Sequence, residues 1–95
     1  MKIKWEAYDP DWLVQLAKEE IPEELLIIEN LKKCTSCFKE SKAYYYFVES
    51  KIPNHPNDNW QFDRNVMLHS KKKGIIILDI LKEDQIGGIE FLSRL

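Results

Sequence analysis

The first clear pattern along the chain is an amphipathic stretch between Asp9 and Pro22. Asp9-Pro10 is a strong helix start, because aspartate caps the first N–H groups and proline has the φ angle of a first helical turn. Proline also disfavours helical backbone in the residue before it, so Ile21-Pro22 ends the segment. Between these signals we expect a helix, whose apolar side chains fall on one face at helical spacing: Trp12, Leu13, Leu16 and Ala17.

The segment Glu23–Asn30 follows no single period. Leu25–Ile28 is apolar on every side, so its spacing fits a buried strand or a buried helix equally well. Two adjacent isoleucines favour the strand slightly, because β-branched residues are enriched in strands. Both alternatives stay open at this point.

The rest of the chain has the alternation and the turn residues of an antiparallel sheet. Aromatic and β-branched residues fill Ala43–Val48, and the polar break Lys39–Lys42 before them predicts a hairpin. Ile52–Asn59, rich in proline and asparagine, predicts an irregular surface loop. Further strands are expected at Asn65–His69, Ile75–Leu81 and Ile86–Leu92, joined by turns at Lys71–Gly74 and Glu83-Asp84, and an edge strand within Met1–Tyr8, where Ile3 and Trp5 share one side. The pattern therefore predicts an α+β fold, with one or two helices on a four- to five-stranded antiparallel sheet.

Length and composition support one domain over residues 1–95, because 44% of the 95 residues are hydrophobic, enough for a single core. No apolar run approaches the roughly 20 residues of a membrane helix. Glu6 comes too early for a signal peptide, so we expect a cytoplasmic protein. The net charge of −2 and the acidic first third argue against a nucleic-acid partner, and the only basic run, Lys71–Lys73, is expected to be a solvated turn.

Cys34 and Cys37 have the spacing of a CxxC motif. In a strand, residues three apart lie about 10 Å apart with side chains on opposite faces, too far for a disulfide or a zinc knuckle. A helix or turn would bring the thiols together, but no second CxxC is present. We expect two reduced, structural cysteines without metal.

The two histidines have no partner that the sequence can identify. His55 lies in the polar loop Pro53–Asn57, and His69 alternates with Met67 on an expected strand, which predicts a half-buried ring. Neither has the neighbours of a nucleophilic dyad. Gly87-Gly88 lies inside an expected strand, where glycine indicates a bulge or a close backbone approach.

Asp79 and Glu90 are the strongest pair of candidate residues. A two-residue loop at Glu83-Asp84 places Asp79 opposite Gly88 and Ile77 opposite Glu90, so both carboxylates share one sheet face as diagonal neighbours. Such a pair can serve acid–base chemistry or hold a cation. It can equally be a structural pair on a face open to water, or one satisfied by lysine and backbone donors.

The aromatic residues exceed what one small core needs: Tyr44, Tyr45, Tyr46, Trp60 and Phe62. Because strand neighbours alternate sides, Tyr45 faces away from Tyr44 and Tyr46. One set is expected in the core, and the other is expected to form an exposed patch of the kind found at protein interfaces, unless a loop covers it.

The segment Leu78–Leu92 resembles the end of a small bacterial domain family of unknown function. The shared features are an Asp-bearing apolar strand at Leu78-Asp79, an acidic turn at Glu83-Asp84 and the strand Gly88-Ile89-Glu90. Asp84 stands where the family has a turn glycine, and aspartate also tolerates left-handed backbone. The resemblance implies a hairpin in the second half of the chain and no catalytic residue.

Together these observations favour a small, acidic, non-enzymatic protein-binding module, of the immunity or antitoxin kind. Its expected binding residues are Tyr44, Tyr46, His55, Trp60, Asp79 and Glu90. One alternative is a small enzyme or a ligand- or ion-binding protein that uses Asp79, Glu90 and the loop near His55. Another is a homo-oligomer joined through an exposed edge strand. No cofactor, metal, nucleic acid or membrane is expected.

Overall fold

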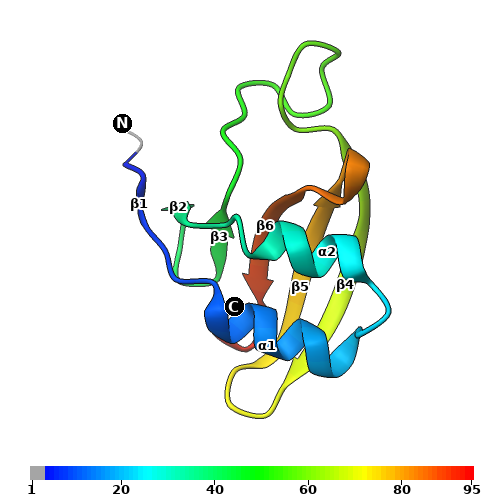
Figure 1. Cartoon of the computed structure of the whole chain (residues 1–95). Coiled ribbons are helices and arrows are strands. Elements are labelled where there is room, and N and C mark those ends of the chain that lie inside the picture. The colour runs from blue at the N-terminus through cyan, green and yellow to red at the C-terminus, as the bar shows by residue number, and fades with distance from the viewer. Residues whose placement is uncertain (1–3) are drawn as a thin grey trace.

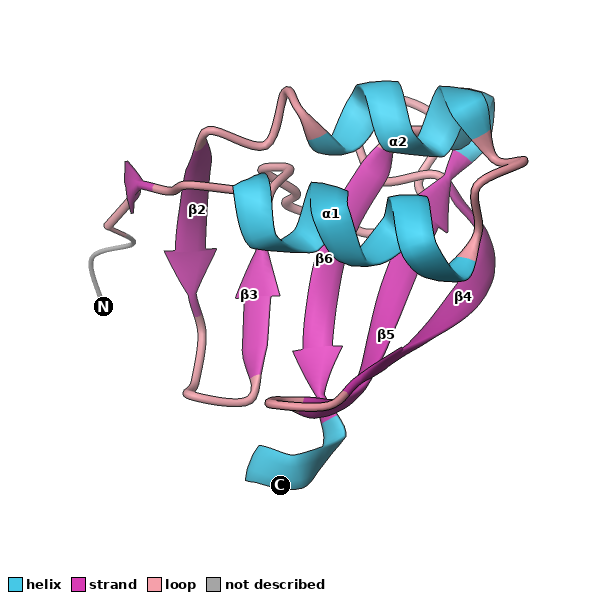
Figure 2. Ribbon diagram, turned by 60° about the horizontal axis from the view of Figure 1, so that its bottom comes forward, coloured by secondary structure: helices cyan, strands magenta, loops and turns pink. Residues whose placement is uncertain are grey.

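The computed structural model describes residues 4–95 and has an α+β fold in which two helices pack on one face of a six-stranded antiparallel sheet (Figures 1 and 2). The predicted fold class is confirmed. The elements are β1 (Glu6–Ala7), α1 (Asp11–Glu20), α2 (Leu25–Leu31), β2 (Ser36–Lys39), β3 (Tyr44–Tyr46), β4 (Phe62–Ser70), β5 (Gly74–Leu81) and β6 (Ile86–Phe91). Short 3₁₀ turns follow β5 and β6, at Lys82–Asp84 and Leu92–Arg94. No helix in the described residues is long and apolar enough to cross a membrane.

The sheet has six strands, one more than the upper limit of the prediction, and the two-residue β1 pairs with β2 at its edge. This strand is the last part of the edge strand expected within Met1–Tyr8. The expected position of Ile3 lies outside the described residues.

Helix α1 ends at the predicted position and begins one residue later than predicted. The Asp9 carboxylate accepts a hydrogen bond from the Asp11 N–H at 3.0 Å, while the Pro10 carbonyl accepts from Leu13 and Val14. Pro10 is therefore the residue flanking the helix, and Asp9 caps from one place earlier. The apolar face buries Leu13, Val14 and Ala17 against the sheet.

Helix α2 corrects the slight preference for a strand at Glu23–Asn30. Ile27, Ile28 and Leu31 are buried at helical spacing, while Leu25 and Leu26 are exposed. Burial of one helical face against the sheet outweighs the small β preference of isoleucine, which is worth less than about 1 kcal/mol per residue.

The strand order is β1-β2-β3-β6-β5-β4, so the last strand lies between the first three and the β4–β5 hairpin (Figure 1). The predicted hairpin around Lys39–Lys42 is confirmed by the pairing of Phe38 with Tyr46. The exposed loop before β4 and the turn at Lys71–Gly74 are also confirmed. Gly74 has a φ of +77°, a left-handed conformation that glycine adopts without steric cost.

The turn between β5 and β6 is one residue longer than predicted, yet Asp79 and Glu90 have the predicted cross-strand partners. Three residues, Lys82–Asp84, form the turn, and Glu83 and Asp84 have φ values of 63° and 57°. A shift of register between Asp79 and Ile80 absorbs the additional residue as a bulge at Gly87. Beyond the bulge Asp79 lies opposite Gly88, and Ile77 lies opposite Glu90, as the two-residue loop predicted.

The core lies between the helices and one face of the sheet. On β5 every second residue, Ile76, Leu78 and Ile80, is fully buried there, together with Ile89 and Phe91 of β6. The intervening residues of each strand point to the opposite face, over which no helix of residues 4–95 lies (Figure 2). We call this opposite side the open face.

Candidate functional site

The three tyrosines of β3 divide between the two faces of the sheet, as the alternation predicted. Tyr45 packs on the helix side against Phe91 and Tyr8, with ring centroids 5.2 and 6.1 Å away. Tyr44 and Tyr46 lie on the open face, 4.6 Å apart between ring centroids. The tyrosines of β3 are therefore divided between the core and the open face.

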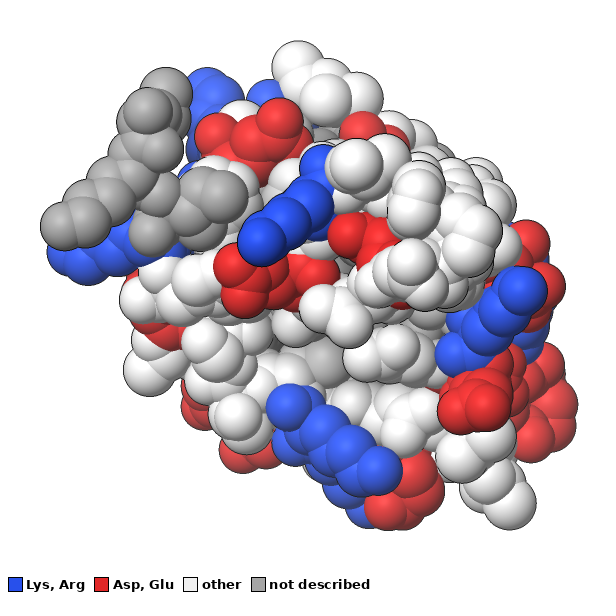
Figure 3. Space-filling model, turned by 90° about the horizontal axis from the view of Figure 1, so that it is seen from above, with Lys and Arg blue, Asp and Glu red and all other residues white. Residues whose placement is uncertain are grey.

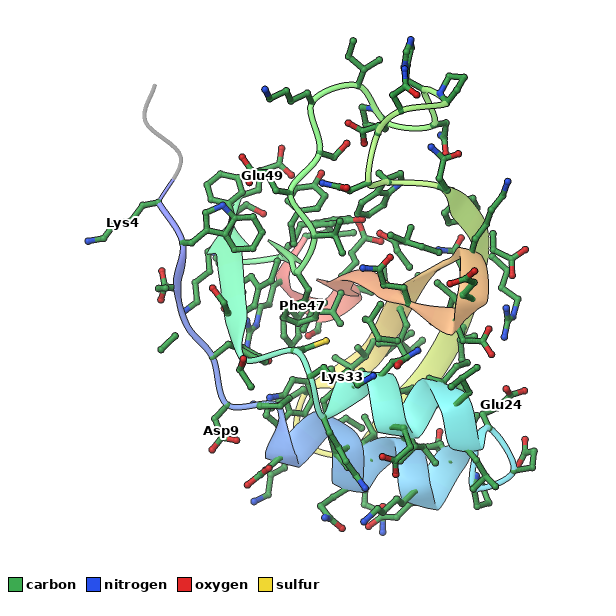
Figure 4. All side chains as sticks on the ribbon, turned by 45° about the horizontal axis from the view of Figure 1, so that its top comes forward. Lys4, Asp9, Glu24, Lys33, Phe47 and Glu49 are labelled. Atoms are coloured by element: carbon green, nitrogen blue, oxygen red, sulfur yellow. The ribbon has the colours of Figure 1, made fainter. Side chains whose placement is uncertain are left out.

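A cleft of about 370 Å³ opens beside Tyr44 and Tyr46 on the open face. We call it the aromatic cleft, and five rings line it: Trp5, Phe38, Tyr44, Tyr46 and Trp60. Phe38 stacks nearly parallel to Tyr46 at 6.3 Å, and Trp60 meets Tyr46 edge-on at 5.7 Å. Glu49 and Lys51 lie at its rim, and Figure 4 shows Glu49 close to the rings.

Asp58 folds the loop that carries Trp60 to the cleft. Its carboxylate accepts hydrogen bonds from the Ser50 hydroxyl at 2.5 Å and from the backbone N–H groups of Lys51, Ile52 and Trp60 at 2.9, 3.1 and 2.9 Å. These donors, the Ser50 hydroxyl first, hold the pKa of Asp58 well below its usual range. A loop of irregular sequence thus has a fixed shape.

Gly87 and Gly88 make room for the aromatic rings. A Cβ on Gly87 would lie 2.8 Å from the Trp60 ring, and a Cβ on Gly88 would lie 2.7 Å from the Tyr45 carbonyl oxygen and 3.2 Å from the Tyr44 ring. The first glycine is the bulge and the second is a close approach, so both expectations for this pair are confirmed. The Tyr44 ring consequently leans over the bare backbone of Gly88.

The Asp79–Glu90 pair lies next to the aromatic cleft. Tyr44 is the cross-strand neighbour of Glu90, while Gly88 lies between Tyr46 and Asp79. Tyr44 is therefore shared, because it lines the cleft on one side and adjoins the carboxylates on the other. The structure brings five of the six predicted binding residues together: Tyr44, Tyr46, Trp60, Asp79 and Glu90.

Asp79 is half-buried, and its only hydrogen-bond donor within residues 4–95 is the Asn65 side-chain amide, 2.7 Å from Oδ1. Burial, and then repulsion by Glu90, raise the pKa of Asp79 from 3.8 to about 6. None of the ion pairs among the described residues includes Asp79 or Glu90. The pair thus carries uncompensated negative charge.

His55 is the predicted binding residue that does not join this group. It is exposed in its loop and does not line the cleft, and its Nδ1 faces the Asn57 N–H at 3.4 Å. His69 is exposed rather than half-buried, because it lies on edge strand β4, where its Nδ1 is 3.2 Å from the Glu20 carboxylate. Neither imidazole ring lines the aromatic cleft.

Both cysteines are free and buried, but only Cys37 lies in a strand. Cys34 lies between α2 and β2, with its thiol 3.6 Å from the Asn30 carbonyl oxygen, so the strand geometry considered for the CxxC segment does not apply to it. Burial raises the pKa of Cys34 to about 12, which keeps it protonated and unreactive at neutral pH.

Cys34 also lines a second hollow, of about 410 Å³, between α2 and the β5–β6 turn. Its other lining residues are mainly polar, and Lys33 and Phe47 at its edge are labelled in Figure 4. The protonated thiol is therefore not a nucleophile in this hollow at neutral pH.

Sequence reasoning did not identify two rings of the aromatic cleft, Trp5 and Phe38. A partial signal for Phe38 was present, since the predicted hairpin places its strand beside β3, but only the observed register pairs Phe38 with Tyr46. Trp5 comes from a separate part of the chain, and its ring meets Phe38 at a tilt, with 6.4 Å between the ring centroids. No short-range pattern connects it with β3.

Comparison with known proteins finds no similar one: no family model matches the chain, and no curated protein and no solved structure is significantly similar to it. The resemblance of Leu78–Leu92 to a small bacterial family therefore stays a prediction. Functional inference rests on the open face itself.

Proposed function

We propose that the chain is a small, non-enzymatic protein-binding module, of the immunity or antitoxin kind, that inhibits its partner by binding it with the open face. The observation that carries this proposal is the aromatic cleft. Both helices cover the other side of the sheet, while five rings gather on the side without a helix. Tyrosine and tryptophan are enriched at the centres of protein interfaces, because they bury a large area at a small cost in side-chain entropy.

The dimensions of the molecule agree with this proposal. A standard interface covers about 800 Å² on each partner, roughly an eighth of the 6303 Å² accessible surface of this chain. One face of the domain therefore suffices. Lysine, arginine, aspartate and glutamate are interspersed on the side of the molecule seen in Figure 3, rather than gathered into a large basic field for nucleic acid.

A second candidate function is that of a small enzyme or ion-binding protein using Asp79 and Glu90. The raised pKa of Asp79 favours it, because perturbed carboxylates are common at active sites. His55 itself is exposed and does not line the cleft, so this alternative has less support from the loop than from the two carboxylates.

Homo-oligomerisation through an edge strand receives less support. Near the two ends of edge strand β4, side chains already accept backbone hydrogen bonds: Glu20 from His69, at 2.8 Å, and Asn54 from Phe62, at 2.9 Å. A second copy would have to displace both acceptors to pair along the whole strand.

The test compares two matched phenylalanine variants. Phe38→Ala removes a ring of the cleft, and Phe62→Ala removes an exposed ring of β4 that does not line it. The first candidate partner is the protein encoded by the neighbouring reading frame, co-expressed with the tagged chain, and binding is measured by calorimetry on the purified proteins. Circular dichroism establishes that both variants fold.

We expect Phe38→Ala to weaken the complex at least about tenfold, as for a central interface residue, and Phe62→Ala to leave it unchanged. Equal binding by both variants would place the interface elsewhere. A turnover assay that finds a substrate, together with no protein partner, would sink the proposal in favour of the enzyme.

A further inference from the structure

We propose that the aromatic cleft receives a cationic side chain of the partner, an arginine, whose guanidinium lies against the rings. This inference rests on the proposed function and names the chemistry of the partner at that site. Three features carry it: the electron-rich rings, the acidic groups around them, and the shape of the guanidinium.

The rings present the surface that an organic cation prefers. The rings of Phe38 and Tyr46 are nearly parallel, and the Trp60 ring meets Tyr46 edge-on. The cleft wall therefore contains ring faces in more than one orientation. A positive group over the face of an aromatic ring is attracted by the ring's quadrupole, most strongly where water is excluded. The same chain already shows this contact elsewhere, where the Arg94 guanidinium lies 3.8 Å from the centre of the Phe91 ring.

The charges around the cleft are mainly acidic. Glu49 lies at the rim, and Glu40 adjoins the Tyr46 hydroxyl, whose pKa is raised by burial and then by that carboxylate. Asp79 and Glu90 lie beyond Tyr44. Lys51 is the only cation that lines the cleft among residues 4–95. The cleft therefore complements positive charge.

The cross-strand neighbours of the two carboxylates leave their charge uncompensated. Tyr44 and Ile77 flank Glu90, and Gly88 and Asn65 flank Asp79, so none of the four carries positive charge. A cation at the cleft would lower the cost of holding these two like charges together on one sheet face.

Arginine fits this site better than a metal ion or a lysine. No group of three or more His, Cys, Asp or Glu side chains within residues 4–95 could hold a metal. The guanidinium is planar and weakly hydrated, so it stacks on rings and pairs with carboxylates at once, whereas the lysine ammonium is a strongly hydrated point charge.

The probe is a short peptide, acetyl-Gly-Arg-Gly-amide, compared with the same peptide carrying citrulline, the neutral isostere of arginine. Binding is followed by NMR chemical-shift titration of the isotope-labelled full chain. We expect the arginine peptide to shift the signals of the cleft rings and to lower the pKa of Asp79. The citrulline peptide is expected to bind at least about fivefold more weakly, because it lacks the charge.

Three variants test whether the rings and the charges at the rim determine binding of the arginine peptide. Phe38→Leu keeps apolar volume but removes a ring, and we expect it to weaken the arginine peptide at least about fivefold. Glu49→Gln and Lys51→Gln change exposed rim residues and are expected to act in opposite directions, each by about two- to threefold, the first weakening and the second tightening. Glu19→Gln, on α1, is the control without effect.

Equal binding of the arginine and citrulline peptides would overturn the inference, as would rim variants that shift affinity in the same direction. Signals of Asp79 and Glu90 that respond to magnesium or calcium chloride but not to the arginine peptide would also overturn it, in favour of an ion site. If partner binding depends on Phe38 while the arginine peptide does not bind, the proposed function stands and this inference falls. If the peptide binds as expected but no protein partner depends on the cleft, the proposed function falls and the site is that of a small cationic ligand.

Discussion

Asp79→Asn is expected to stabilise the fold at neutral pH. The pKa of the Asp79 carboxyl rises from 3.8 to about 6 on folding. This rise corresponds to a destabilisation of the charged folded state by about 3 kcal/mol, because a tenfold change in proton affinity is worth about 1.4 kcal/mol. Asp79 is only half-buried, so screening by water reduces this to about 1–2 kcal/mol. Asparagine removes the charge while its side-chain oxygen still accepts the hydrogen bond from Asn65.

The contribution of Asp79 to the free energy of unfolding decreases as the pH rises. Because the pKa of Asp79 is higher in the folded chain, the folded chain binds the proton more tightly between about pH 4 and pH 6. The contribution of Asp79 to stability is therefore complete below about pH 4 and is lost as the pH rises through 6. The advantage of Asp79→Asn should be present at pH 7 and have largely disappeared at pH 4.

Thermal melting and urea unfolding at several pH values measure this difference. For a domain of this size, about 1–2 kcal/mol corresponds to a rise in Tm of roughly 5–10 °C. Asp63→Asn is the matched control, because Asp63 is paired with Arg64 at 2.6 Å and its amide should give no gain. An unchanged or lower Tm for Asp79→Asn at pH 7, or a gain that persists at pH 4, would refute the electrostatic account of this carboxylate.

Three further predictions concern the scaffold of the site. Asp58→Ala should lower the Tm and speed hydrogen exchange at the Trp60 amide, because the variant lacks the carboxylate that orders the loop; unchanged exchange would mean that the loop holds its shape without it. Gly88→Ala should cost about 1–3 kcal/mol in denaturant unfolding, since its Cβ meets the Tyr45 carbonyl oxygen, and a wild-type midpoint would contradict that close approach. Cys34 and Cys37 should react slowly with Ellman's reagent at pH 8 and rapidly in guanidinium chloride, because burial raises both pKa values; rapid reaction in the native state would show that the thiols are accessible.

The strands were predictable where local rules decide them. Alternation, turn residues and the spacing of Asp79 from Glu90 give β5, β6 and their register. The register survives even though the turn is one residue longer than expected, since Gly87 absorbs the difference. Helix α1 was predictable for the same reason, because its start and stop signals lie within it and beside it.

Long-range packing decided what local rules could not. Leu25–Ile28 is apolar on every side, and only the sheet beneath it selects which residues a helix buries. The aromatic cleft is assembled from β2, β3 and the segments before β1 and β4, so its composition depends on tertiary contacts. Trp5 is the clearest example, because its ring meets Phe38 from a distant part of the sequence.

The position of β6 has a consequence for how the chain is made. β6 is the last of the six strands to leave the ribosome, yet it alone joins the β1–β3 half of the sheet to the β4–β5 hairpin. Until Phe91 has emerged, β3 and β5 each present an unpaired edge. The cross-strand pair of Tyr44 with Glu90 has not formed, and neither have the pairs that Gly88 makes with Tyr46 and Asp79. Any nascent chain truncated before Ile86 would therefore lack the joined sheet, and the binding surface forms only after synthesis of this domain is complete.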